Sequence, residues 1–412
     1  MPGPGFYWIG EEEEKELIDL IHAGYLFRYG DEKDAHFKHR VKSLEEEVAH
    51  AFDIGHALAV SSGTAALQTA MASAGIGPGD EVIVPGYTFI ASISSVIFCN
   101  AVPVLAEIDE SLTMDPDDVE RRITPYTRAI LPVHMLGNPA NLDRLLEIAK
   151  KHGLPVIEDA AQAFGASYKE RRVGTYGMFG IYSFNIFKTI NAGDGGMLVT
   201  HDSELYERAF SYHDQGHLPL RMGVEVGNRS VIGQNFRMNE LTAAVLVAQF
   251  RKLDQIVTRL RALKSRFKRQ ISDVKGLGFR KINDPNGECG TILTVLLPDK
   301  KSADIVAQKI GTSTVARSGW HVYNNMEHIL AMKMINPKNN PVTNPYYKGK
   351  VEYRKGMLPV TDRILERAVN ISIGVVDPGL GAGFGININS SDDEVDSKAE
   401  QFRKIAVEVI GP

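Results

Sequence analysis

The feature that most constrains the fold is a regular alternation of short apolar runs with helical stretches between residues 57 and 200. The runs are ALAVS (57–61), EVIVP (81–85), VPVLAEI (102–108), AILPVHM (129–135), LPVIEDA (154–160), IYSFN (181–185) and GMLVT (196–200). Helical patterns such as TAALQTAMASAG and NLDRLLEIAKKHG lie between them. This alternation predicts an α/β fold with a mostly parallel sheet covered by helices on both faces. Ligands bind such sheets outside the carboxyl ends of the strands, so the residues that follow these runs are the candidates for function.

The pattern changes in the last third of the chain. Residues 237–262 predict one long helix or two joined helices, and shorter runs such as GTILTVLLP (290–298) follow. We therefore predict an N-terminal segment or arm (1–40), a large domain (41–262) and a smaller α+β domain (263–412). Residues 335–357 are rich in Pro, Asn and Lys and predict a long loop, of the kind that is functional or mobile.

Composition excludes several classes of protein. With 46 basic and 51 acidic residues the net charge is −5, which gives no reason to expect a nucleic acid or an anionic membrane as partner. Two cysteines cannot form a disulfide framework or a thiolate cluster, and the spacing of His213 and His217 lacks a third ligand, so no metal site is expected. No signal peptide and no apolar run of membrane length is apparent. A cytoplasmic enzyme is the expectation.

Small residues end the first run in SSGTAALQTA (61–70), and a helix pattern begins there. The backbone N–H groups of Gly63 and Thr64 would then lie at a helix N-terminus, where phosphate binds well. The same letters also describe an ordinary N-cap, the commoner reason for such a sequence.

Two further motifs follow later strands. In IEDAAQA, Asp159 could keep a pyridine nitrogen protonated and Gln162 could contact the same ring, although Asp159 could equally cap the next helix. In YSFNIFKTINAGDGG, Lys188 could form a Schiff base and Ser183 could donate to a phosphate. A lone lysine is more often a surface residue.

The three motifs together, each at the end of a separate strand, resemble the DegT/DnrJ/EryC1/StrS family of sugar aminotransferases, a branch of the fold-type I pyridoxal-phosphate (PLP) enzymes. The matching stretches are SSGTAAL, GDEVIVPGYTFIAS, VPVLAEID, ITPYTRAILPVHMLGNPANLD, VIEDAAQAFGASYKERRVGTYG, YSFNIFKTINAGDGGML and GQNFRMNELTAAV. They cover residues 55 to 250 almost continuously, which is more specific than any single motif. The C-terminal third matches only loosely.

The resemblance implies a role for each matching position. Lys188 would hold PLP and move the proton during the reaction, with pyridoxamine phosphate as the intermediate form of the cofactor. Asp159 would pair with the pyridine nitrogen, Gln162 would contact the oxygen side of the ring, and Phe89 would stack on its face. From the residues alone, Phe89 is better explained as a core side chain.

The resemblance also implies how the phosphate is held. Gly63, Thr64 and Ser183 would bind it from the same chain, and Asn235 in GQNFRM would reach it from the neighbouring subunit. A homodimer with shared active sites is therefore implied.

The implied reaction moves an amino group from glutamate or glutamine to a keto- or aldehydo-sugar. LFRYG, HDQGH and AVNISIGVVDPGLGAGFGIN further resemble aminotransferases that make 8-amino-3,8-dideoxy-manno-octulosonate (8-amino-Kdo) for lipopolysaccharide. The alternative acceptor is a nucleotide-linked keto-sugar for O-antigen or antibiotic biosynthesis. Some relatives are sugar dehydratases with histidine in place of the lysine, and a non-catalytic PLP-binding regulator on the same fold is the alternative of another class.

Three more residues are candidate substrate contacts. His134 follows a strand in LPVHMLG, and Arg237 and His321 lie in other polar stretches. Structural, salt-bridged roles explain Arg237 and His321 equally well. Asn185 and Ile186 depart from the family pattern and change the wall beside Lys188. The Gly-rich segment 378–387 is either a loop near the site or a plain surface turn.

Overall fold

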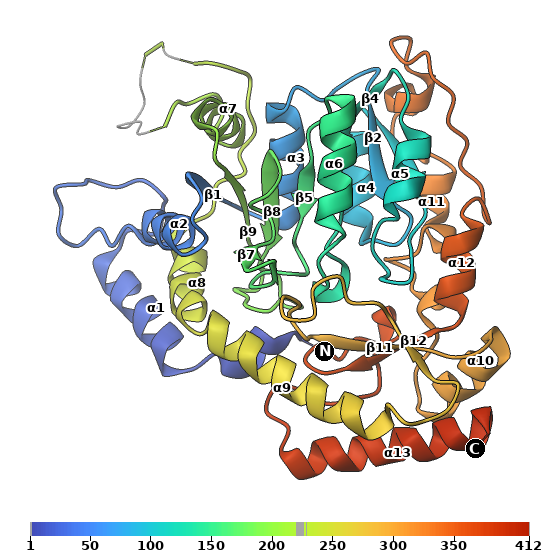
Figure 1. The fold of residues 1–412 in the computed structure, drawn as a ribbon. Helices are drawn as coiled ribbons and strands as arrows, with labels where there is room; N and C mark the ends of the chain where they lie inside the picture. Colours follow the sequence, from blue (N-terminus) through green and yellow to red (C-terminus); the bar gives the residue numbers. More distant parts are fainter. Residues whose placement is uncertain (1, 220–225, 228, 412) are drawn as a thin grey trace.

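The computed structural model describes residues 2–219, 226, 227 and 229–411 (Figure 1). A four-stranded group in the order β1-β9-β8-β5 lies beside a three-stranded group in the order β3-β2-β4. Parallel bridges from Ile130 to Val156 and from Val133 to Asp159 join β4 to β5, so the two groups form one sheet. Strand β9 is antiparallel to both of its neighbours and the other pairs are parallel, which confirms the predicted mostly parallel sheet. The strands are β1 (His56–Val60), β2 (Glu81–Pro85), β3 (Val102–Ala106), β4 (Thr127–Ile130), β5 (Ile157–Asp159), β8 (Phe179–Ser183) and β9 (Gly196–Thr200).

Helices bury both faces of this sheet, which explains why its strands are continuously apolar rather than alternating. In β1, Ala57 and Ala59 pack into one core, whereas Leu58 and Val60 pack into another on the opposite face. The second core contains side chains of α3 (Gly63–Ser73), α4 (Ile90–Phe98) and α7 (Ser203–His213). The opposite face is covered by α2 (Arg40–Ala51), α5 (Pro116–Arg122), α6 (Leu142–His152) and α8 (Glu240–Arg251). A two-stranded ribbon, β6 (Ser167–Tyr168) and β7 (Arg171–Arg172), follows β5.

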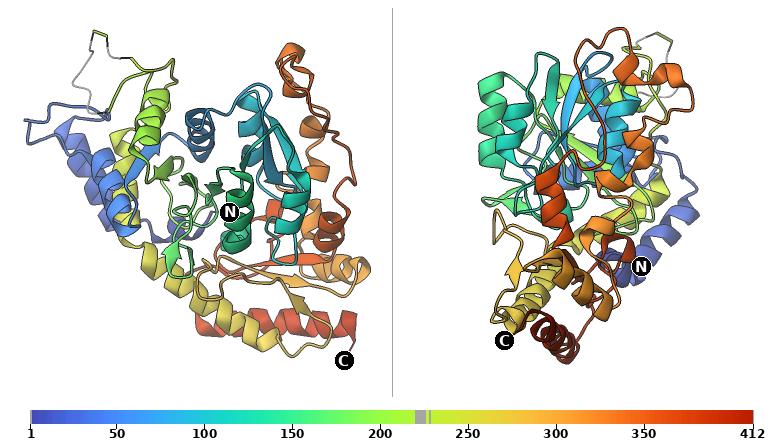
Figure 2. Two further views of the ribbon diagram at one scale, coloured as in Figure 1. Left: turned by 45° about the horizontal axis from the view of Figure 1, so that its top comes forward. Right: turned by 90° about the vertical axis from the view of Figure 1, so that its right-hand side faces the viewer.

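A second, antiparallel sheet lies in the C-terminal part, in the order β10-β11-β12. Its strands are β10 (Gly278–Phe279), β11 (Ile292–Leu296) and β12 (Ala368–Ser372). The long helices α9 (Leu253–Ile271) and α13 (Asp392–Ile410) run side by side beneath it, with α10 (Lys300–Lys309) next to them (Figures 1 and 2). The described residues also contain the helices α1 (Glu11–Ala23), α11 (Glu327–Leu330) and α12 (Pro359–Glu366). The 3-10 turns are η1 (Pro4–Trp8), η2 (Met135–Gly137), η3 (Val315–Arg317), η4 (Tyr323–Asn325), η5 (Pro337–Asn339), η6 (Pro341–Thr343) and η7 (Pro378–Leu380).

One predicted boundary needs correction. Two helices joined at Lys252 occupy the segment predicted as helical after residue 237, but α9 continues to Ile271. The boundary at 262/263 therefore falls inside a helix, because the apolar stripe of α9 serves both the large sheet and the smaller one. The predicted N-terminal segment contains α1 (Glu11–Ala23), which packs against α8 and buries Glu13, and Glu13 accepts a hydrogen bond from Lys252 at 2.7 Å. Between 335 and 357 the structure has only short 3-10 turns, as the loop prediction requires.

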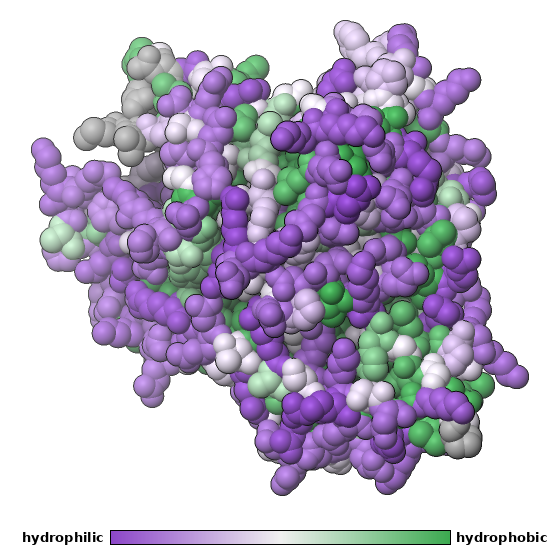
Figure 3. Space-filling view, viewed as in Figure 1, coloured by the Kyte–Doolittle hydropathy of each residue, from purple (hydrophilic) through white to green (hydrophobic). Residues whose placement is uncertain are grey.

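Within the described residues no helix is long and apolar enough to cross a membrane. The face seen in Figure 3 carries mainly hydrophilic side chains, with hydrophobic residues in separate patches. The same part of the chain contains no group of three or more His, Cys, Asp or Glu side chains placed to hold a metal ion. Residues 220–225 and 228, within the loop at 213–234, lie outside the described residues.

The fully buried carboxylate of Glu158 accepts hydrogen bonds from several segments around the centre of the large sheet. Glu158 accepts hydrogen bonds from the backbone N–H groups of Gly174 (2.8 Å), Tyr176 (2.7 Å) and Gly177 (2.7 Å). His134 Nδ1 accepts from the N–H of Ala140 at 3.0 Å, so its Nε2 carries the hydrogen that Glu158 receives at 3.0 Å. The loop after β7 and the end of β4 are therefore both fastened to β5.

We predict that Glu158→Ala lowers the free energy of unfolding by about 3 kcal/mol, because it leaves several buried donors without an acceptor. Chemical denaturation followed by circular dichroism measures this. Glu147→Ala is the matched control: Glu147 is exposed on α6 and pairs with Arg144, so the midpoint should barely move. Equal midpoints for the two variants would contradict a structural role for Glu158.

Candidate active site

Four parallel strands deliver the predicted site residues to one edge of the sheet. Strand β1 ends before Gly63 and Thr64, β2 before Phe89, β5 at Asp159, and β8 at Ser183 shortly before Lys188. A small cavity of about 100 Å³ is lined by all of these, by Gln162 and by Ser62. The structure thus places seven of the eight predicted cofactor contacts around one cavity.

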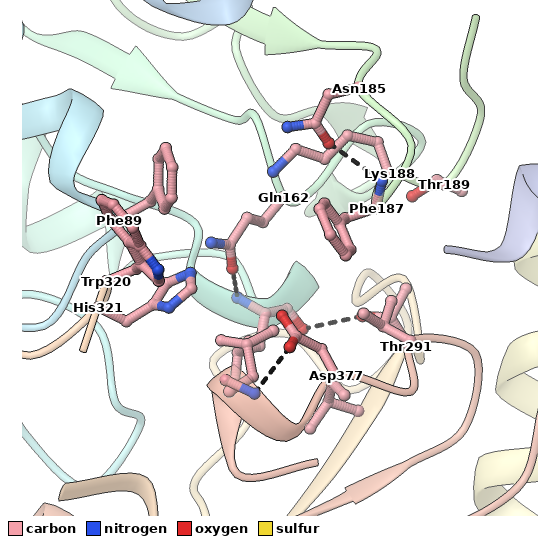
Figure 4. A pocket seen from close by; sticks show the side chains of 15 residues that line it. Phe89, Gln162, Asn185, Phe187, Lys188, Thr189, Thr291, Trp320, His321 and Asp377 are labelled. Carbon is pink, nitrogen blue, oxygen red and sulfur yellow. Dashed lines mark hydrogen bonds between the residues drawn. The ribbon is translucent and has the colours of Figure 1, made fainter. Parts of the chain in front are cut away.

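Lys188 lies in a turn after β8. Its N–H donates to the carbonyl of Asn185 at 3.0 Å, and the Asn185 side chain accepts from the N–H of Phe187 at 3.0 Å, so the turn is held on both sides. The half-buried Lys188 side chain faces the cavity (Figure 4). Burial lowers the pKa of the Lys188 amine to about 8, and the carboxylates of Asp159 and Asp377 offset part of that effect. A larger share of this amine is neutral near pH 7 than in an exposed lysine.

Asp159 is 4% exposed at the end of β5 and keeps its carboxylate in a defined orientation. Ser92 Oγ donates to Oδ2 at 2.6 Å, and the N–H of Ala161 donates to Oδ1 at 3.1 Å. Thr88 Oγ1 in turn contacts Ser92 Oγ at 2.7 Å. The helix-cap alternative is wrong, because residues 160–166 form turns and no helix. The bond to Ala161 is a local turn contact, and the carboxylate lines the cavity.

The start of α3 forms a tight cradle against β8. Ser62 caps the helix by accepting from the N–H of Ala65 at 3.1 Å. A Cβ at Gly63 would lie 2.8 Å from the Cβ of Ser183, so a glycine is required for the helix N-terminus to approach that hydroxyl. The N–H groups of Gly63 and Thr64 thus point to the same cavity wall as Ser183. Both the N-cap and the anion-site interpretation of SSGT describe this turn.

Gln162 and Phe89 form the remaining walls. Gln162 Oε1 accepts from the N–H of Leu136 at 2.9 Å, which leaves its amide nitrogen toward the cavity. Phe89 is 37% exposed and its ring lies 5.4 Å from that of His321, so it is not the core side chain that its surroundings in the sequence favour.

These residues fit pyridoxal phosphate. The cavity offers helix N–H groups and a hydroxyl for a phosphate, a buried carboxylate for a ring N–H, and an amine of lowered pKa. A Cβ at Gly63 would collide with Ser183, so only glycine lets the helix N-terminus and the Ser183 hydroxyl lie close enough to hold one phosphate together.

A larger cavity of about 410 Å³ adjoins the first and shares Phe89, Gln162, Asn185 and Lys188 with it. Its other walls come mainly from the C-terminal part of the chain. They are Leu136, Phe187, Thr189, Thr291, Ile292, Trp320, His321, Val375, Asp377, Gly379 and Leu380. Figure 4 shows that Lys188, Gln162 and His321 face the same space. The Gly-rich segment after 378 is thus a loop near the site.

His321 presents a defined ring nitrogen to this cavity. Ser318 Oγ must donate to the carbonyl of Gly379 at 2.5 Å, so it accepts from His321 Nδ1, 3.0 Å away. Burial and the nearby Lys188 lower the pKa of His321 to about 3, so the ring is neutral. Its Nε2 is therefore an acceptor that can receive a hydroxyl hydrogen.

Two of the predicted substrate contacts lie outside both cavities of their own chain. His134 is fully buried and uses both ring nitrogens on Ala140 and Glu158, so the substrate role predicted for it is wrong. Arg237 forms an ion pair with Asp214 at 2.5 Å, which agrees with its structural alternative, and its substrate contact stays a prediction. A strand-end position does not distinguish a side chain that faces a ligand from one that fastens the strand.

Asn235 is exposed and lines neither cavity of its own chain. Its backbone pairs with Asp214 in an isolated bridge. Its predicted contact to a neighbouring subunit's phosphate stays a prediction.

Several cavity residues were missed by the sequence analysis. Ser92 follows Phe89 by three residues in the stretch that resembles the family, so a polar residue on the first turn of that helix was an available signal. Trp320, Asp377 and Thr291 have no such signal, because their approach to Lys188 depends on how the second sheet packs.

The comparisons with known proteins agree with this geometry. Residues 9–376 match the DegT/DnrJ/EryC1/StrS aminotransferase family. The chain is 31% identical over 405 residues to the spore coat polysaccharide biosynthesis protein SpsC of Bacillus subtilis, covering 96% of this chain and 95% of that one. It is 38% identical over 235 residues to GDP-perosamine synthase of Escherichia coli O157:H7, a match that spans 57% of this chain and 64% of that enzyme.

The crystal structure of DesV from S. venezuelae in complex with a ketimine intermediate superposes with a TM-score of 0.75 at 30% identity, covering 96% of this chain and 94% of that one. The fold is therefore that of the fold-type I PLP aminotransferases, as the resemblance implied. The chain belongs to the DegT/DnrJ/EryC1/StrS aminotransferase family, and it is a pyridoxal-phosphate-dependent aminotransferase.

Proposed function

We propose that this enzyme transfers the amino group of glutamate or glutamine to a keto- or aldehydo-sugar, with Lys188 as the catalytic residue. The observation that carries the proposal is the position of the Lys188 amine, which lines both the small cavity and the larger one and whose pKa is lowered to about 8. An amine with this pKa takes up and releases protons readily near neutral pH.

The small cavity supports the assignment of cofactor contacts. PLP, when bound, supplies an electron sink that lets a bond to hydrogen at the amino acid's α-carbon break. Asp159, whose orientation is maintained by Ser92, would keep a hydrogen on the pyridine nitrogen. Phe89 would cover the ring. Lys188 would hold the cofactor and, once free, its amine would take up and release the transferred proton.

The larger cavity supports a hydroxylated acceptor. His321 Nε2 and the carboxylate of Asp377 are acceptors that face it, and both suit sugar hydroxyl groups. Trp320 and Phe89, whose ring centroids are 6.5 Å apart, provide an aromatic wall for the C–H face of a sugar. These side chains orient the substrate carbonyl toward Lys188.

Two acceptors are proposed in order. The first is the C8 aldehyde of an oxidised Kdo, giving 8-amino-Kdo for lipopolysaccharide; the resembling segment AVNISIGVVDPGLGAGFGIN supports it, because Asp377 and Gly379 of this segment line the acceptor cavity. The second is a nucleotide-linked keto-sugar, which the name of the relative GDP-perosamine synthase supports.

We also propose a homodimer in which Asn235 completes the partner's site. Asn235 is exposed beside apolar side chains that face solvent, Phe27 (49% exposed) and Ile232 (98% exposed). Arg237 lies 5.3 Å from the Phe27 ring and connects the two segments. An exposed apolar surface of this kind is typical of an interface between subunits.

We predict that PLP attaches to the apoenzyme at a rate that rises with pH up to about 8 and then levels off. Only the neutral amine reacts, and burial lowers its pKa from the usual 10.5 to about 8, so the reactive fraction rises with pH up to about 8. The lowered pKa also destabilises the folded apoenzyme. This loss of stability is complete below pH 8 and absent above pH 10.5. Stopped-flow absorbance measures the rate. Lys188→Ala should show no attachment; a midpoint near 10.5 would contradict the buried amine.

The acceptor is tested by single turnover. The enzyme is first converted to its pyridoxamine form with glutamate, then mixed with the C8 aldehyde of Kdo, with GDP- or dTDP-linked keto-sugars, or with 2-oxoglutarate as a control. We predict that the Kdo aldehyde restores the PLP spectrum at least about 100-fold faster than the nucleotide sugars, a difference that a few polar contacts can supply. The reverse order supports the nucleotide-linked acceptor, and no conversion by glutamate or glutamine indicates the non-catalytic regulator.

The shared site is tested by complementation. Lys188→Ala and Asn235→Ala are each expected to be strongly impaired. When they are mixed under conditions that exchange subunits, half of the dimers are mixed and each has one intact site, so activity should recover to about a quarter of wild type. No recovery despite exchange, shown by differently tagged subunits, would place Asn235 in its own chain's site, and an unimpaired Asn235→Ala variant would place it in no site.

A further inference from the structure

The turn that follows β4 has an uncommon backbone conformation next to the cofactor cavity. Leu136 is left-handed, with φ 55° and ψ 35°, although it is not a glycine and is only 3% exposed. Such a conformation is unfavourable for a residue with a Cβ and persists only where the surrounding structure holds it. The residues that hold Leu136 are therefore of interest.

Both peptide groups of Leu136 are hydrogen-bonded to side chains. Its N–H donates to Gln162 Oε1 at 2.9 Å, and its carbonyl accepts from Thr291 Oγ1 at 3.3 Å. Figure 4 draws a dashed line from each of the labelled side chains Gln162 and Thr291. Arg280 Nη2 also donates to this carbonyl, at 3.3 Å. Because a backbone N–H requires an acceptor, the amide of Gln162 has one orientation, with its two N–H donors toward the cavity.

Arg280 is a buried cation whose hydrogen bonds go to the same turn. It is 3% exposed, and its guanidinium donates to the carbonyls of Met135 (3.2 Å) and Leu136. No ion pair within the described ranges includes it, and its Nε has no hydrogen-bond partner there. Burial lowers the pKa of Arg280, and the charge of Glu288, which pairs with Lys264, offsets part of this effect. The hydrogen bonds of the guanidinium go to the turn at 135–136.

Thr291 and Arg280 both belong to the second sheet. Arg280 directly follows β10 and Thr291 directly precedes β11. The N–H of Cys289 also donates to the carbonyl of Gly137 at 2.9 Å, next to the same turn. Residues that flank the strands of the second sheet therefore hydrogen-bond to this turn on one side, and Gln162 hydrogen-bonds to it on the other.

We propose that Thr291 and Arg280 are positioning residues that act on the cofactor through Leu136 and Gln162. They hold Leu136 in its left-handed conformation, Leu136 fixes the amide of Gln162, and Gln162 then donates a hydrogen bond to the ring oxygen of the cofactor. The proposal rests on the assignment of Gln162 to the oxygen side of the ring. It connects the second sheet to cofactor affinity rather than to substrate binding.

The test uses pyridoxamine 5′-phosphate, which has the same ring oxygen and forms no covalent bond to Lys188. Its Kd is measured by quenching of intrinsic fluorescence for wild type, Thr291→Val and Thr291→Ser. Valine has the shape of threonine without the hydroxyl, so we expect Kd to rise about tenfold, the effect of one lost hydrogen bond. Serine keeps the hydroxyl, so its Kd should stay within about threefold of wild type.

A double-mutant cycle distinguishes action through Gln162 from a separate effect. If Thr291 acts through Gln162, adding Thr291→Val to Gln162→Leu changes Kd by less than about twofold. Penalties that multiply, or a Thr291→Val variant with wild-type Kd, would overturn the proposal.

Arg280→Lys provides a second, independent arm. Lysine keeps the charge but lacks the planar fork whose two terminal nitrogens donate separately to the carbonyls of Met135 and Leu136. We therefore expect a weaker Kd that again does not multiply with the effect of Gln162→Leu. This arm decides the question if Thr291→Val fails to fold, as judged by thermal unfolding. If the wild-type enzyme does not bind pyridoxamine phosphate, the cofactor site itself is contradicted. If it binds but the penalties of the two substitutions multiply, only the positioning role is contradicted.

Discussion

Burial of the Lys188 amine is the constraint on which the rest of the site depends. An ammonium group in a poorly hydrated cavity is disfavoured, and the effect brings the pKa of Lys188 to about 8. The carboxylates of Asp159 and Asp377 moderate this shift from two sides, one in the large sheet and one in the C-terminal part. The amine is therefore balanced between burial, which makes it reactive, and charge, which keeps it able to hold a proton. Burial and the charge of Lys188 also lower the pKa of His321, so its ring is neutral and its Nε2 is an acceptor.

This balance requires elements that are far apart in sequence to meet within one cavity. The parallel strands bring together the residues on one side of the cavity, because their carboxyl ends lie at one edge of the sheet and each contributes a residue there. The second sheet achieves the other half, since it brings His321, Asp377 and Thr291 over that edge. The hydrogen bonds that support the polar groups are as specific as the groups themselves: Ser92 orients Asp159, and Ser318 orients His321.

The sequence predicted the first half of this arrangement well and the second half poorly. Runs such as EVIVP and GMLVT coincide with β2 and β9 because strands covered on both faces are continuously apolar. Lys188, Asp159 and Gly63 could be found because each follows such a run. His134 follows one too, yet its ring is engaged by Glu158 and Ala140, and nothing in the local sequence reveals that. Trp320 and Asp377 could not be found, because long-range packing alone places them at the site.

The turn at Leu136 shows how the two halves depend on each other. A left-handed leucine is unfavourable in isolation, so the large sheet alone does not specify it. It is held because Gln162 offers an acceptor on one side and Arg280 and Thr291 offer donors on the other. A shift of the second sheet would release the Leu136 carbonyl, and the amide of Gln162 would then lose the contact that sets its direction. Packing between the two sheets and the geometry of the cofactor cavity are therefore one property of this fold, and the strained residue lies where they meet.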